Sequence, residues 1–351
     1  MNLMTYNKIA DYYGKVLKTK KDLKTSACCS LEKSPAYVQE PLDLIDEEIQ
    51  NKFYGCGSPI PLVLEGMKVL DLGCGTGRDC FVISYHVGAT GEVVGIDMTV
   101  EQLEIANKYL PVQTKRFGFE KPNIRFIQGY IEDLKSLNLP DSYFDIVVSN
   151  CVVNLSPDKD LVFQEVFRVL KEGGEFFFSD VYADRRLPSW AKEDTVLLGE
   201  CLGGALYWKD FERLAKRAGF IDPRVFASSQ ISLLDKETIE KIGFAAFHSI
   251  TYRLFKLKDL EDACEDYGQI AKYRGTIKES PHQFMLDHHH LFARGKPVAV
   301  CSNTASMLAK TRLAQHFEIT GNVSQHYGLF AGCGETPLGK DQGPISSGCC
   351  Y

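Results

Sequence analysis

Cysteine is the residue type with the greatest capacity for chemistry in this sequence. The 351 residues include twelve cysteines, and no two of them have the Cys-x-x-Cys spacing that marks many zinc and redox motifs. Cys28–Cys29 and Cys349–Cys350 are adjacent pairs, and the others are scattered. In a reducing compartment they stay thiols, so catalysis or binding of a soft metal becomes the question. Several thiols can meet only if the fold brings them together.

Three of these cysteines occupy suggestive places. Cys151 directly follows an apolar run at 144–150, and Cys201 lies in the glycine-rich stretch 199–208. Cys56 lies in Phe-Tyr-Gly-Cys-Gly, just before the alternating pattern of strands and helices begins. A single buried cysteine usually only packs. The three together are candidate functional thiols.

The elements that must position these thiols alternate between strand and helix. Continuous apolar strands separated by helices predict a parallel sheet covered on both faces. Gly173-Gly174 should end the helix expected at 159–170, before the fifth strand begins. A further helix is expected at 211–218 and should stop at Gly219. Expected strands are Met67–Asp71, Glu92–Asp97, Ile124–Gln128, Phe144–Asn150, Glu175–Ser179, Arg224–Leu234 and Ala246–Leu257, and expected helices between them are Arg78–Val87, Val100–Leu110 and Lys159–Leu170.

Composition limits the classes of function. Apolar residues make up 44% and charged residues 25%, as in an ordinary globular protein. The formal charge of −6 argues against a nucleic-acid partner, which would need a basic face. A span of about eighteen apolar residues and a secretory leader are both missing. We therefore expect a cytoplasmic enzyme with a small substrate and no membrane partner.

A glycine loop follows the first predicted strand. It reads Asp-Leu-Gly-Cys-Gly-Thr-Gly-Arg at 71–78, where backbone N–H groups at a helix start can meet a polar ligand. A dinucleotide site would need G-x-G-x-x-G, but here the third glycine comes one place early. This spacing favours the GxGxG loop of class I methyltransferases over that of NAD enzymes.

The ends of the next strands support this interpretation. Asp97 ends the second strand, where a carboxylate can accept both ribose hydroxyls. The segment at 128–132 ends the third strand, where side chains flank an adenine, and Asn150 ends the fourth. The sequence thus predicts S-adenosylmethionine as cofactor. Predicted cofactor-binding residues are Asp71, Gly73, Gly75, Thr76, Gly77, Arg78, Asp97, Met98, Gly129, Ile131, Glu132 and Asn150.

The rhythm of the sequence divides the chain into three parts. Residues 1–60 are expected to form a helical arm carrying Cys28 and Cys56, and residues 61–257 the class I methyltransferase domain, Rossmann-like with a seven-stranded sheet and an insertion around 181–222. Residues 258–351 should form a small α+β domain with a hairpin at 283–300, a helix at 304–315 and a flexible Cys-containing tail.

Several motifs make the sequence similar to the arsenite S-adenosylmethionine methyltransferases. The resemblance runs from about Tyr12 to Leu257, and Gly-Glu-Cys-Leu-Gly-Gly-Ala-Leu-Tyr-Trp at 199–208 is its most specific stretch. Others are Tyr-Tyr-Gly at 12–14, Tyr-Gly-Cys-Gly at 54–57, Gly-Arg-Asp-Cys at 77–80, Gly-Ile-Asp-Met at 95–98, Gly-Tyr-Ile-Glu at 129–132, Val-Ser-Asn-Cys at 148–151 and Phe-Ser-Asp-Val-Tyr at 178–182.

The resemblance implies four functional thiols. They map onto Cys28, Cys56, Cys151 and Cys201, although Cys29 could replace Cys28. It further implies that Cys56, Cys151 and Cys201 are the ligands of arsenite, that Cys28 and Cys56 form a redox pair, and that the insertion helps to bind arsenic. Tyr54 matches the family's tyrosine near the sulfonium.

The chemistry of arsenic explains the need for thiols. Trivalent arsenic is soft and prefers sulfur, and three thiols give a pyramidal product whose lone pair can attack a methyl group. Positioning within about 3–3.5 Å is then the main task of the protein. Methyl transfer oxidises arsenic, so arsenite and methylarsenite as substrates imply a thioredoxin-like or glutathione reductant.

Other candidates are expected to be structural. Cys74 and Cys80 should pack, Glu200 should be a surface carboxylate, and His288 and His290 should share a face of a surface strand without binding metal. Two rival functions stay open. The chain could methylate carbon, oxygen or nitrogen of a small molecule, or it could be a thiol module that only sequesters arsenic, antimony or zinc.

Overall fold

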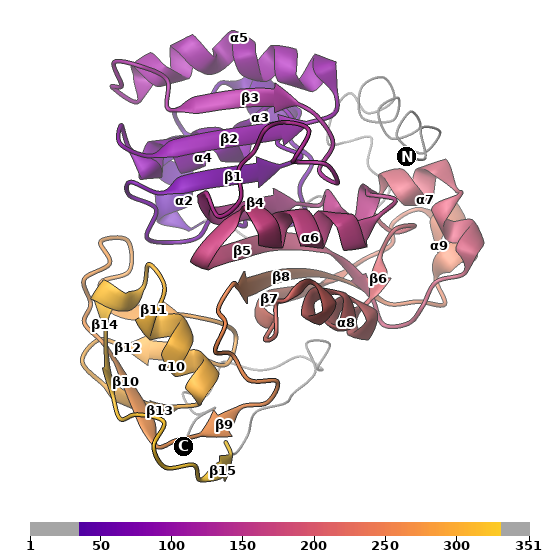
Figure 1. The fold of residues 1–351 in the computed structure, drawn as a ribbon. Helices are drawn as coiled ribbons and strands as arrows, with labels where there is room; N and C mark the ends of the chain where they lie inside the picture. Colours follow the sequence, from indigo (N-terminus) through magenta and orange to yellow (C-terminus); the bar gives the residue numbers. More distant parts are fainter. Residues whose placement is uncertain (1–34, 331–351) are drawn as a thin grey trace.

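The computed structural model describes residues 35–330, and its core is one twisted sheet (Figure 1). The strand order is β3-β2-β1-β4-β5-β8-β7, with β8 antiparallel to both of its neighbours. This confirms the predicted seven-stranded class I sheet; the two-residue β6 (Leu206–Tyr207) adds a short pairing at the end of β5. The strands are β1 Lys68–Leu72, β2 Glu92–Asp97, β3 Ile124–Gln128, β4 Phe144–Asn150, β5 Leu170–Ala183, β7 Arg224–Ile231 and β8 Phe247–Phe255.

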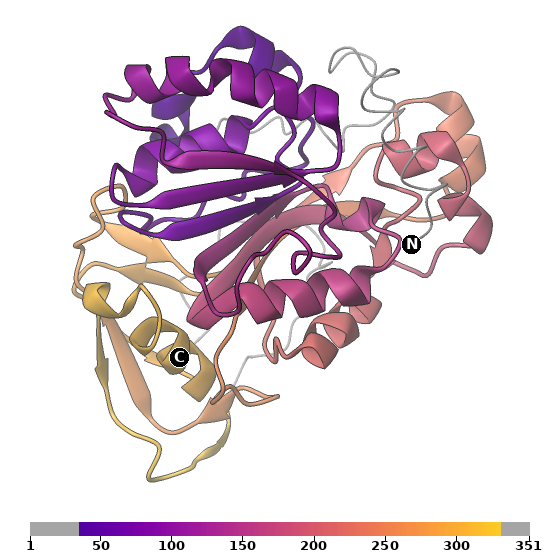
Figure 2. The ribbon, with the colours of Figure 1, turned by 45° about the horizontal axis from the view of Figure 1, so that its top comes forward.

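Helices cover both faces of the sheet because the strands are apolar on both sides. In β1, Leu70 belongs to the core under one set of helices, and Val69 belongs to the core under the other. Figure 2 shows the two layers on either side of the strands. One face is covered by α2 (Ala36–Leu42), α3 (Glu47–Asn51), α4 (Arg78–Val87) and α5 (Val100–Arg116), and the other by α6 (Lys159–Val169) and α8 (Trp208–Ala218).

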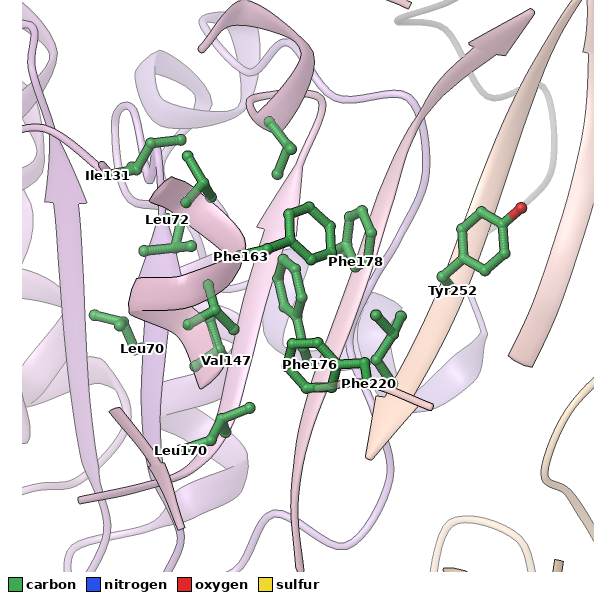
Figure 3. Close-up of a cluster of buried hydrophobic side chains, with 14 of the residues drawn as sticks. Leu70, Leu72, Ile131, Val147, Phe163, Leu170, Phe176, Phe178, Phe220 and Tyr252 are labelled. Carbon is green, nitrogen blue, oxygen red and sulfur yellow. The ribbon is translucent and has the colours of Figure 1, made fainter. Parts of the chain in front are cut away.

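Aromatic side chains dominate the core beneath α6. Phe176 and Phe178 on β5 stack with ring centroids 4.1 Å apart, and Phe163 of α6 meets both edge-on (Figure 3). Each ring is fully buried, and such burial stabilises the fold by about 1.5–3 kcal/mol for a side chain of this kind. This packing fixes β5, whose far end carries part of the candidate site.

Several predicted boundaries were wrong, and three of them have a clear physical cause. Gly173 and Gly174 lie inside β5 and do not end α6, because their backbone bonds with Lys256 extend the sheet. A Cβ at Gly173 would lie 2.6 Å from the carbonyl oxygen of Lys310. The glycine therefore permits these two segments of the backbone to lie close together. Helix α5 continues to Arg116, whose guanidinium binds Asp46 at 2.6 Å.

The third wrong boundary belongs to the helix expected at 304–315. It is α10, which runs only over Ser302–Ala309, and the 3-10 turn η5 (Ala314–His316) follows it. Thr311 separates the two: its hydroxyl donates to the carbonyl of Met307 and accepts from the N–H of Leu313.

The C-terminal domain is a small α+β unit beside the end of the main sheet (Figure 1). The expected hairpin is formed by β11 and β12, whereas β13 pairs with β10 in a separate three-stranded sheet. Its core is built around aromatic residues such as Phe284, Phe292 and Phe317. The strands are β9 Glu265–Asp266, β10 Gln269–Tyr273, β11 Gln283–Met285, β12 Leu291–Ala293, β13 Pro297–Val300, β14 Phe317–Thr320 and β15 Gly328–Leu329.

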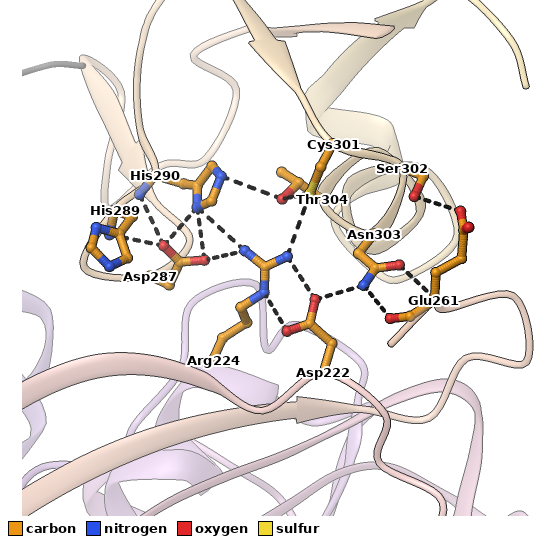
Figure 4. A network of polar contacts seen from close by, with 10 residues as sticks. All are labelled: Asp222, Arg224, Glu261, Asp287, His289, His290, Cys301, Ser302, Asn303 and Thr304. Carbon is orange, nitrogen blue, oxygen red and sulfur yellow. Dashed lines mark hydrogen bonds and ion pairs between the residues drawn. The ribbon is translucent and has the colours of Figure 1, made fainter. Parts of the chain in front are cut away.

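Two buried networks join the C-terminal domain to the main sheet. Glu175 on β5 forms ion pairs with Arg253 of β8 and Arg312 of the C-terminal domain. Arg224 of β7 pairs with Asp222 at 2.7 Å and with Asp287 of the C-terminal domain at 3.1 Å (Figure 4). Pairing of this kind offsets the cost of burying the charges.

The second network corrects our expectation for the histidines. His288 and His290 lie in the loop between β11 and β12, not on a surface strand. His290 is 5% exposed and contacts the carboxylate of Asp287 at 2.7 Å (Figure 4). The Nδ1 atom of His288 contacts the carbonyl of Val225. The histidines serve the junction between the domains.

The segment after β5 forms a separate small core. It contains η4 (Ser189–Lys192) and α7 (Thr195–Gly199), and α9 (Lys236–Ile242) packs nearby. The three thiols of interest are buried in this core, together with apolar residues of these elements. Among residues 35–330, no helix is both long and apolar enough to cross a membrane.

Candidate active site

A cleft opens at the carboxyl ends of the parallel strands and encloses about 960 Å³, its open mouth included. Of the predicted cofactor residues, its walls contain Tyr54, Asp71, Gly73, Gly75, Thr76, Asp97, Met98, Gly129, Ile131, Glu132 and Asn150. This is the position at which open α/β sheets bind ligands. Its walls are mainly backbone of the glycine loop on one side and strand-end side chains on the other.

The glycine loop takes conformations that a side chain would oppose. Gly73 has φ +72°, and a Cβ there would lie 2.3 Å from a methyl carbon of Val152 on the facing wall. Gly77 has φ +83° and is the N-cap of α4. Glycine adopts such angles without steric cost, which is why the loop can turn sharply at the base of the cleft.

Asp97 holds the glycine loop in place through hydrogen bonds within the chain. Its two carboxylate oxygens accept the backbone N–H groups of Gly75 and Thr99, each at 2.8 Å. Burial raises the pKa of Asp97, and these hydrogen bonds partly oppose the rise. A carboxylate oxygen has a further lone pair, so Asp97 can also accept a ligand hydroxyl.

Asn150 connects the cleft to the segment that carries Cys56. Its amide oxygen accepts the backbone N–H of Cys56 at 3.0 Å. Its amide nitrogen donates to the carbonyl of Gly57 and to the carboxylate of Asp79, both at 3.0 Å. One side chain in the cleft wall therefore fixes the position of a candidate thiol.

Two predicted cofactor residues lie outside the lining of the cleft. Gly77 begins α4, and Arg78 turns toward Asp79, which it binds at 2.6 Å. The Arg78 guanidinium also stacks 3.1 Å from the ring centre of Phe53. Arg78 thus supports Phe53, which itself lines the cleft.

Sequence reasoning missed about half of the lining. The missed residues are mostly neighbours in sequence of predicted ones, and that proximity was the signal that could have found them. Ser156 donates a short hydrogen bond to Glu132 across the cleft wall. Missed lining residues are Lys52, Phe53, Cys74, Asp79, Thr99, Gln102, Tyr130, Val152, Leu155 and Ser156.

Cys74 and Cys80 lie behind and beside the loop. Cys80 is fully buried, and its thiol donates to the carboxylate of Asp71 at 3.2 Å. Burial, reinforced by the neighbouring Asp79, raises the pKa of Asp71 to about 8. Burial also raises the pKa of the Cys74 thiol to about 11. Both thiols therefore stay protonated near neutral pH, as packing residues would.

The three candidate thiols come together at one side of the cleft. Cys151 lines the cleft and forms a disulfide with Cys56, although the two are 95 residues apart in sequence. The Cys201 thiol lies 3.4 Å from the carbonyl oxygen of Cys151. All three are nearly inaccessible, with Cys56 the most exposed at 4%.

A disulfide joins Cys56 and Cys151, a pairing that we did not predict. The expected redox pair of Cys28 and Cys56 stays a prediction, because Cys28 lies outside the described residues. The hydrogen bonds of Asn150 explain the proximity, because they place the backbone of Cys56 beside the end of β4. Cys28, Cys29 and Cys349–Cys350 lie outside the described residues.

Two of the thiols are carried on unusual backbone. Cys151 has φ +59° and Cys201 has φ +61°, and only three other non-glycine residues between 35 and 330 have positive φ. Such conformations cost free energy and concentrate at functional sites. In both cases the turn places the sulfur in the small core behind the cleft.

A buried aspartate and a partly buried lysine lie near the thiols. Asp180 on β5 has a carboxylate oxygen within 4.8 Å of the sulfurs of both Cys56 and Cys151. Burial raises the pKa of Asp180 to about 7. Lys159 donates to the carbonyls of Asn154 and Ser156 at 3.0 and 2.9 Å, and burial lowers the pKa of Lys159 to about 8.

Glu200 was expected at the surface, and that expectation was wrong. Its relative exposure is 0%, because it directly follows α7 in the small core that contains the thiols. The sequence neighbour of the candidate thiol Cys201 is thus buried together with it.

Known protein families and relatives match this chain along most of its length. The model of the methyltransferase domain matches residues 64–219, and that of the arsenite methyltransferase C-terminal domain matches residues 267–342. The arsenite methyltransferase of Aquipseudomonas alcaligenes is 54% identical, over 94% of both chains. The mouse arsenite methyltransferase is 45% identical, over 89% of this chain and 82% of its own.

A solved structure agrees in three dimensions. The crystal structure of an arsenic(III) S-adenosylmethionine methyltransferase from Chlamydomonas reinhardtii is 50% identical and superposes with a TM-score of 0.82. The match covers 85% of this chain and 100% of that one. The two domain matches and the relatives that align along nearly the whole chain agree with one another, and this chain belongs to the arsenite methyltransferase family.

Proposed function

We propose that this enzyme transfers methyl groups from S-adenosylmethionine to trivalent arsenic held by the thiolates of Cys56, Cys151 and Cys201. The observation that carries the proposal is the position of Cys151. It lines the cofactor cleft, its sulfur bonds that of Cys56, and its carbonyl lies 3.4 Å from the Cys201 thiol. One of the three thiols therefore lies in the cleft wall, and the other two lie next to it behind that wall.

The cleft has the donors and acceptors that S-adenosylmethionine would need. Asp97 is a partly buried acceptor at the end of β2, suited to ribose hydroxyls. In the glycine loop, a Cβ at Gly75 would come no closer than 4.0 Å to the nearest atom, so the cleft is open there. Tyr54 lines the same cleft, and the face of an aromatic ring can stabilise a cation. When bound, the cofactor supplies an electrophilic methyl group on a sulfonium.

Arsenic binding is a condensation. Arsenous acid and three thiols give a trithiolate and three molecules of water, and arsenic stays trivalent. The thiols must first be reduced, because the structure holds Cys56 and Cys151 as a disulfide. The task of the chain is then to hold arsenic so that its unshared electron pair faces the cleft, and no base is needed at the methyl step.

The reaction needs electrons after each transfer. Methyl transfer leaves arsenic formally pentavalent, and oxidation of two thiolates to a disulfide returns two electrons and restores the trivalent state. A thioredoxin-like protein or glutathione would reopen that disulfide by exchange. Cys28, or Cys29 in its place, stays our candidate for the fourth thiol. The same need for reduced thiols supports a cytoplasmic location and a role in arsenic detoxification.

The test uses purified protein with labelled S-adenosylmethionine, a thiol reductant and either arsenite or methylarsenite, and resolves the arsenic species formed. Cys151→Ser and Cys201→Ser should abolish methylation of both substrates. Cys28→Ser and Cys56→Ser should abolish methylation of arsenite only, because two thiols are enough to hold methylarsenite. Cys264→Ser, in the C-terminal domain, is the matched control and should keep both activities.

Three outcomes would contradict the proposal. Full turnover of arsenite by Cys151→Ser would show that arsenic is not held by the proposed thiolates. Arsenite binding without any methylated product would indicate a sequestering module. Methylation of an organic carbon, oxygen or nitrogen centre, with arsenite ignored, would indicate a different methyltransferase.

A further inference from the structure

Asp180 is a buried carboxylate that the proposed chemistry does not yet use. It lies near the end of β5 and is 1% exposed. One of its oxygens lies within 4.8 Å of the sulfurs of both Cys56 and Cys151. In residues 35–330 this is the one group of three potential ligand residues whose atoms approach so closely. Asp180 therefore faces the place where arsenic would bind.

The known contacts of Asp180 leave it able to bind a ligand. Its Oδ2 accepts the backbone N–H of Asn154 at 2.9 Å, and its Oδ1 accepts the N–H of Val181 at 2.8 Å. The backbone of Val153 is a further donor to Asp180. A carboxylate has about four acceptor positions, so these three N–H donors do not exhaust it. The nearby Lys159 instead donates to the carbonyls of Asn154 and Ser156.

Arsenic offers the complementary donor at one stage of binding. When the Cys56–Cys151 disulfide is reduced by two equivalents of a thiol reductant, the products are two protein thiols and the oxidised reductant. Arsenous acid then condenses with these two thiols, loses two molecules of water and keeps one hydroxyl group. That hydroxyl is a hydrogen-bond donor confined among two sulfurs and the carboxylate.

We propose that Asp180 is a substrate-binding residue for inorganic arsenite: its carboxylate accepts a hydrogen bond from the hydroxyl that arsenic keeps while Cys56 and Cys151 hold it. This inference rests on the thiolate site proposed above. The third thiol, from Cys201, then replaces the hydroxyl, which leaves as water, and arsenic stays trivalent throughout. Asp180 thus stabilises the loading state that precedes the trithiolate.

The same geometry makes Asp180 selective. Methylarsenite has two hydroxyl groups, and both leave when two thiols bind it. No hydroxyl then remains for the carboxylate to accept. Asp180 should therefore contribute to the binding of inorganic arsenite and not to that of an organic arsenical held by two thiolates.

The experiment traps the loading state by removing the third thiol. The Cys201→Ser protein is reduced, and binding of arsenite and of phenylarsine oxide is measured by equilibrium dialysis with arsenic determined by mass spectrometry. Addition of Asp180→Ala should weaken arsenite binding about tenfold, as expected for loss of one hydrogen bond to a charged group. Phenylarsine oxide, which keeps no hydroxyl on two thiolates, should bind with unchanged affinity.

A matched control and a conservative variant complete the design. Asp184→Ala removes a carboxylate just beyond the same strand, bonded to Arg185 and to the backbone of Ala246, and should change neither affinity. If Asp180→Ala does not fold, Asp180→Asn keeps a neutral acceptor and should weaken only arsenite binding, by about threefold, because a neutral acceptor forms a weaker bond.

The outcomes separate this inference from the thiolate site itself. Unchanged arsenite affinity in Asp180→Ala, or an equal loss for both arsenicals, would overturn the role of Asp180, since a purely structural defect affects both probes. If the Cys201→Ser protein with Asp180 intact binds neither arsenical, then the thiolate site fails, and the inference fails with it.

Discussion

Buried carboxylates behave in opposite ways at the cleft and at the junction with the C-terminal domain. At the cleft, burial raises the pKa of Asp71 to about 8 and that of Asp180 to about 7. At the junction, burial again opposes ionisation, but Arg253 and Arg312 hold the pKa of Glu175 below its usual value. His290 and Arg224 do the same for the pKa of Asp287.

The difference teaches how each region is used. At the junction, Glu175 and Asp287 each meet a cation that compensates the carboxylate charge, and such pairs serve to fix one domain against another. At the cleft, the carboxylates of Asp97 and Asp180 accept backbone N–H groups, and that of Asp71 accepts a thiol. Perturbed, incompletely compensated groups of this kind are typical of functional sites.

The strongest way to break this comparison is to remove a junction cation. Arg253→Met leaves Glu175 buried with Arg312 as its remaining partner, so the free energy of unfolding should fall by about 3–5 kcal/mol. Urea denaturation measures this change. Affinity for S-adenosylhomocysteine, measured by calorimetry on the folded protein, should be unchanged.

The control for this prediction is an exposed ion pair of the C-terminal domain. Lys310→Met breaks the contact with Asp259, in which both side chains are about half exposed, and should change stability by less than about 1 kcal/mol. If Arg253→Met lost cofactor affinity while keeping its stability, the division between the two regions would be wrong.

The second prediction removes an acceptor at the cleft. In Asp97→Asn, affinity for S-adenosylhomocysteine should fall about tenfold to a hundredfold, because hydrogen bonds to a charged acceptor are lost and the loop at Gly75 loses its anchor. The melting temperature should fall by only a few degrees. An unchanged affinity in calorimetry would show that Asp97 only shapes the loop.

The third and smallest effect is a pH dependence of stability. An aspartate in the unfolded chain loses its proton near pH 4, whereas Asp71 keeps its proton in the folded state up to about pH 8. The contribution of Asp71 to the free energy of unfolding is therefore fully present below about pH 4, and it is lost as the pH rises from about 4 to about 8. Relative to wild type, Asp71→Asn should gain a few degrees in melting temperature between about pH 5 and pH 8.

The opposite sign is expected at the junction. The pKa of Asp287 is lowered, burial notwithstanding, by His290 and Arg224, so its contribution is present at neutral pH and is lost on acidification. Asp287→Asn should therefore be less stable than wild type at neutral pH, and the difference should shrink below about pH 4. Equal pH trends for Asp71→Asn and Asp287→Asn in thermal unfolding would end the contrast.

The sheet could be predicted from the sequence because each strand is specified by a short run of neighbouring residues. The apolar runs at 124–128 and 144–150 gave both strands with the observed bounds, and the glycine loop lies at the cleft where its spacing placed it. Short segments of this kind carry their own period and turn residues. Predicted boundaries were wrong where a segment distant in sequence packs against the element, as at Gly173, which lies against Lys310.

The thiol site depends on contacts that no local pattern contains. Asn150 binds the backbone of Cys56 across 94 positions, and Asp180 reaches the same sulfurs from another strand. The burial of Glu200 and the role of His290 likewise depend on packing between elements distant in sequence. Residue types identified the candidates, and tertiary structure selected among their partners.

The left-handed backbone at Cys151 and Cys201 has a consequence for the engineering of this protein. Glycine would relieve a conformational penalty of about 1 kcal/mol at either position. At Cys151, however, glycine would also remove the disulfide with Cys56, and loss of a disulfide costs about 2–5 kcal/mol. A laboratory selection for thermal resistance alone should therefore keep cysteine at position 151. At Cys201, which forms no disulfide, the main chain adopts the same strained conformation for the sake of a buried sulfur.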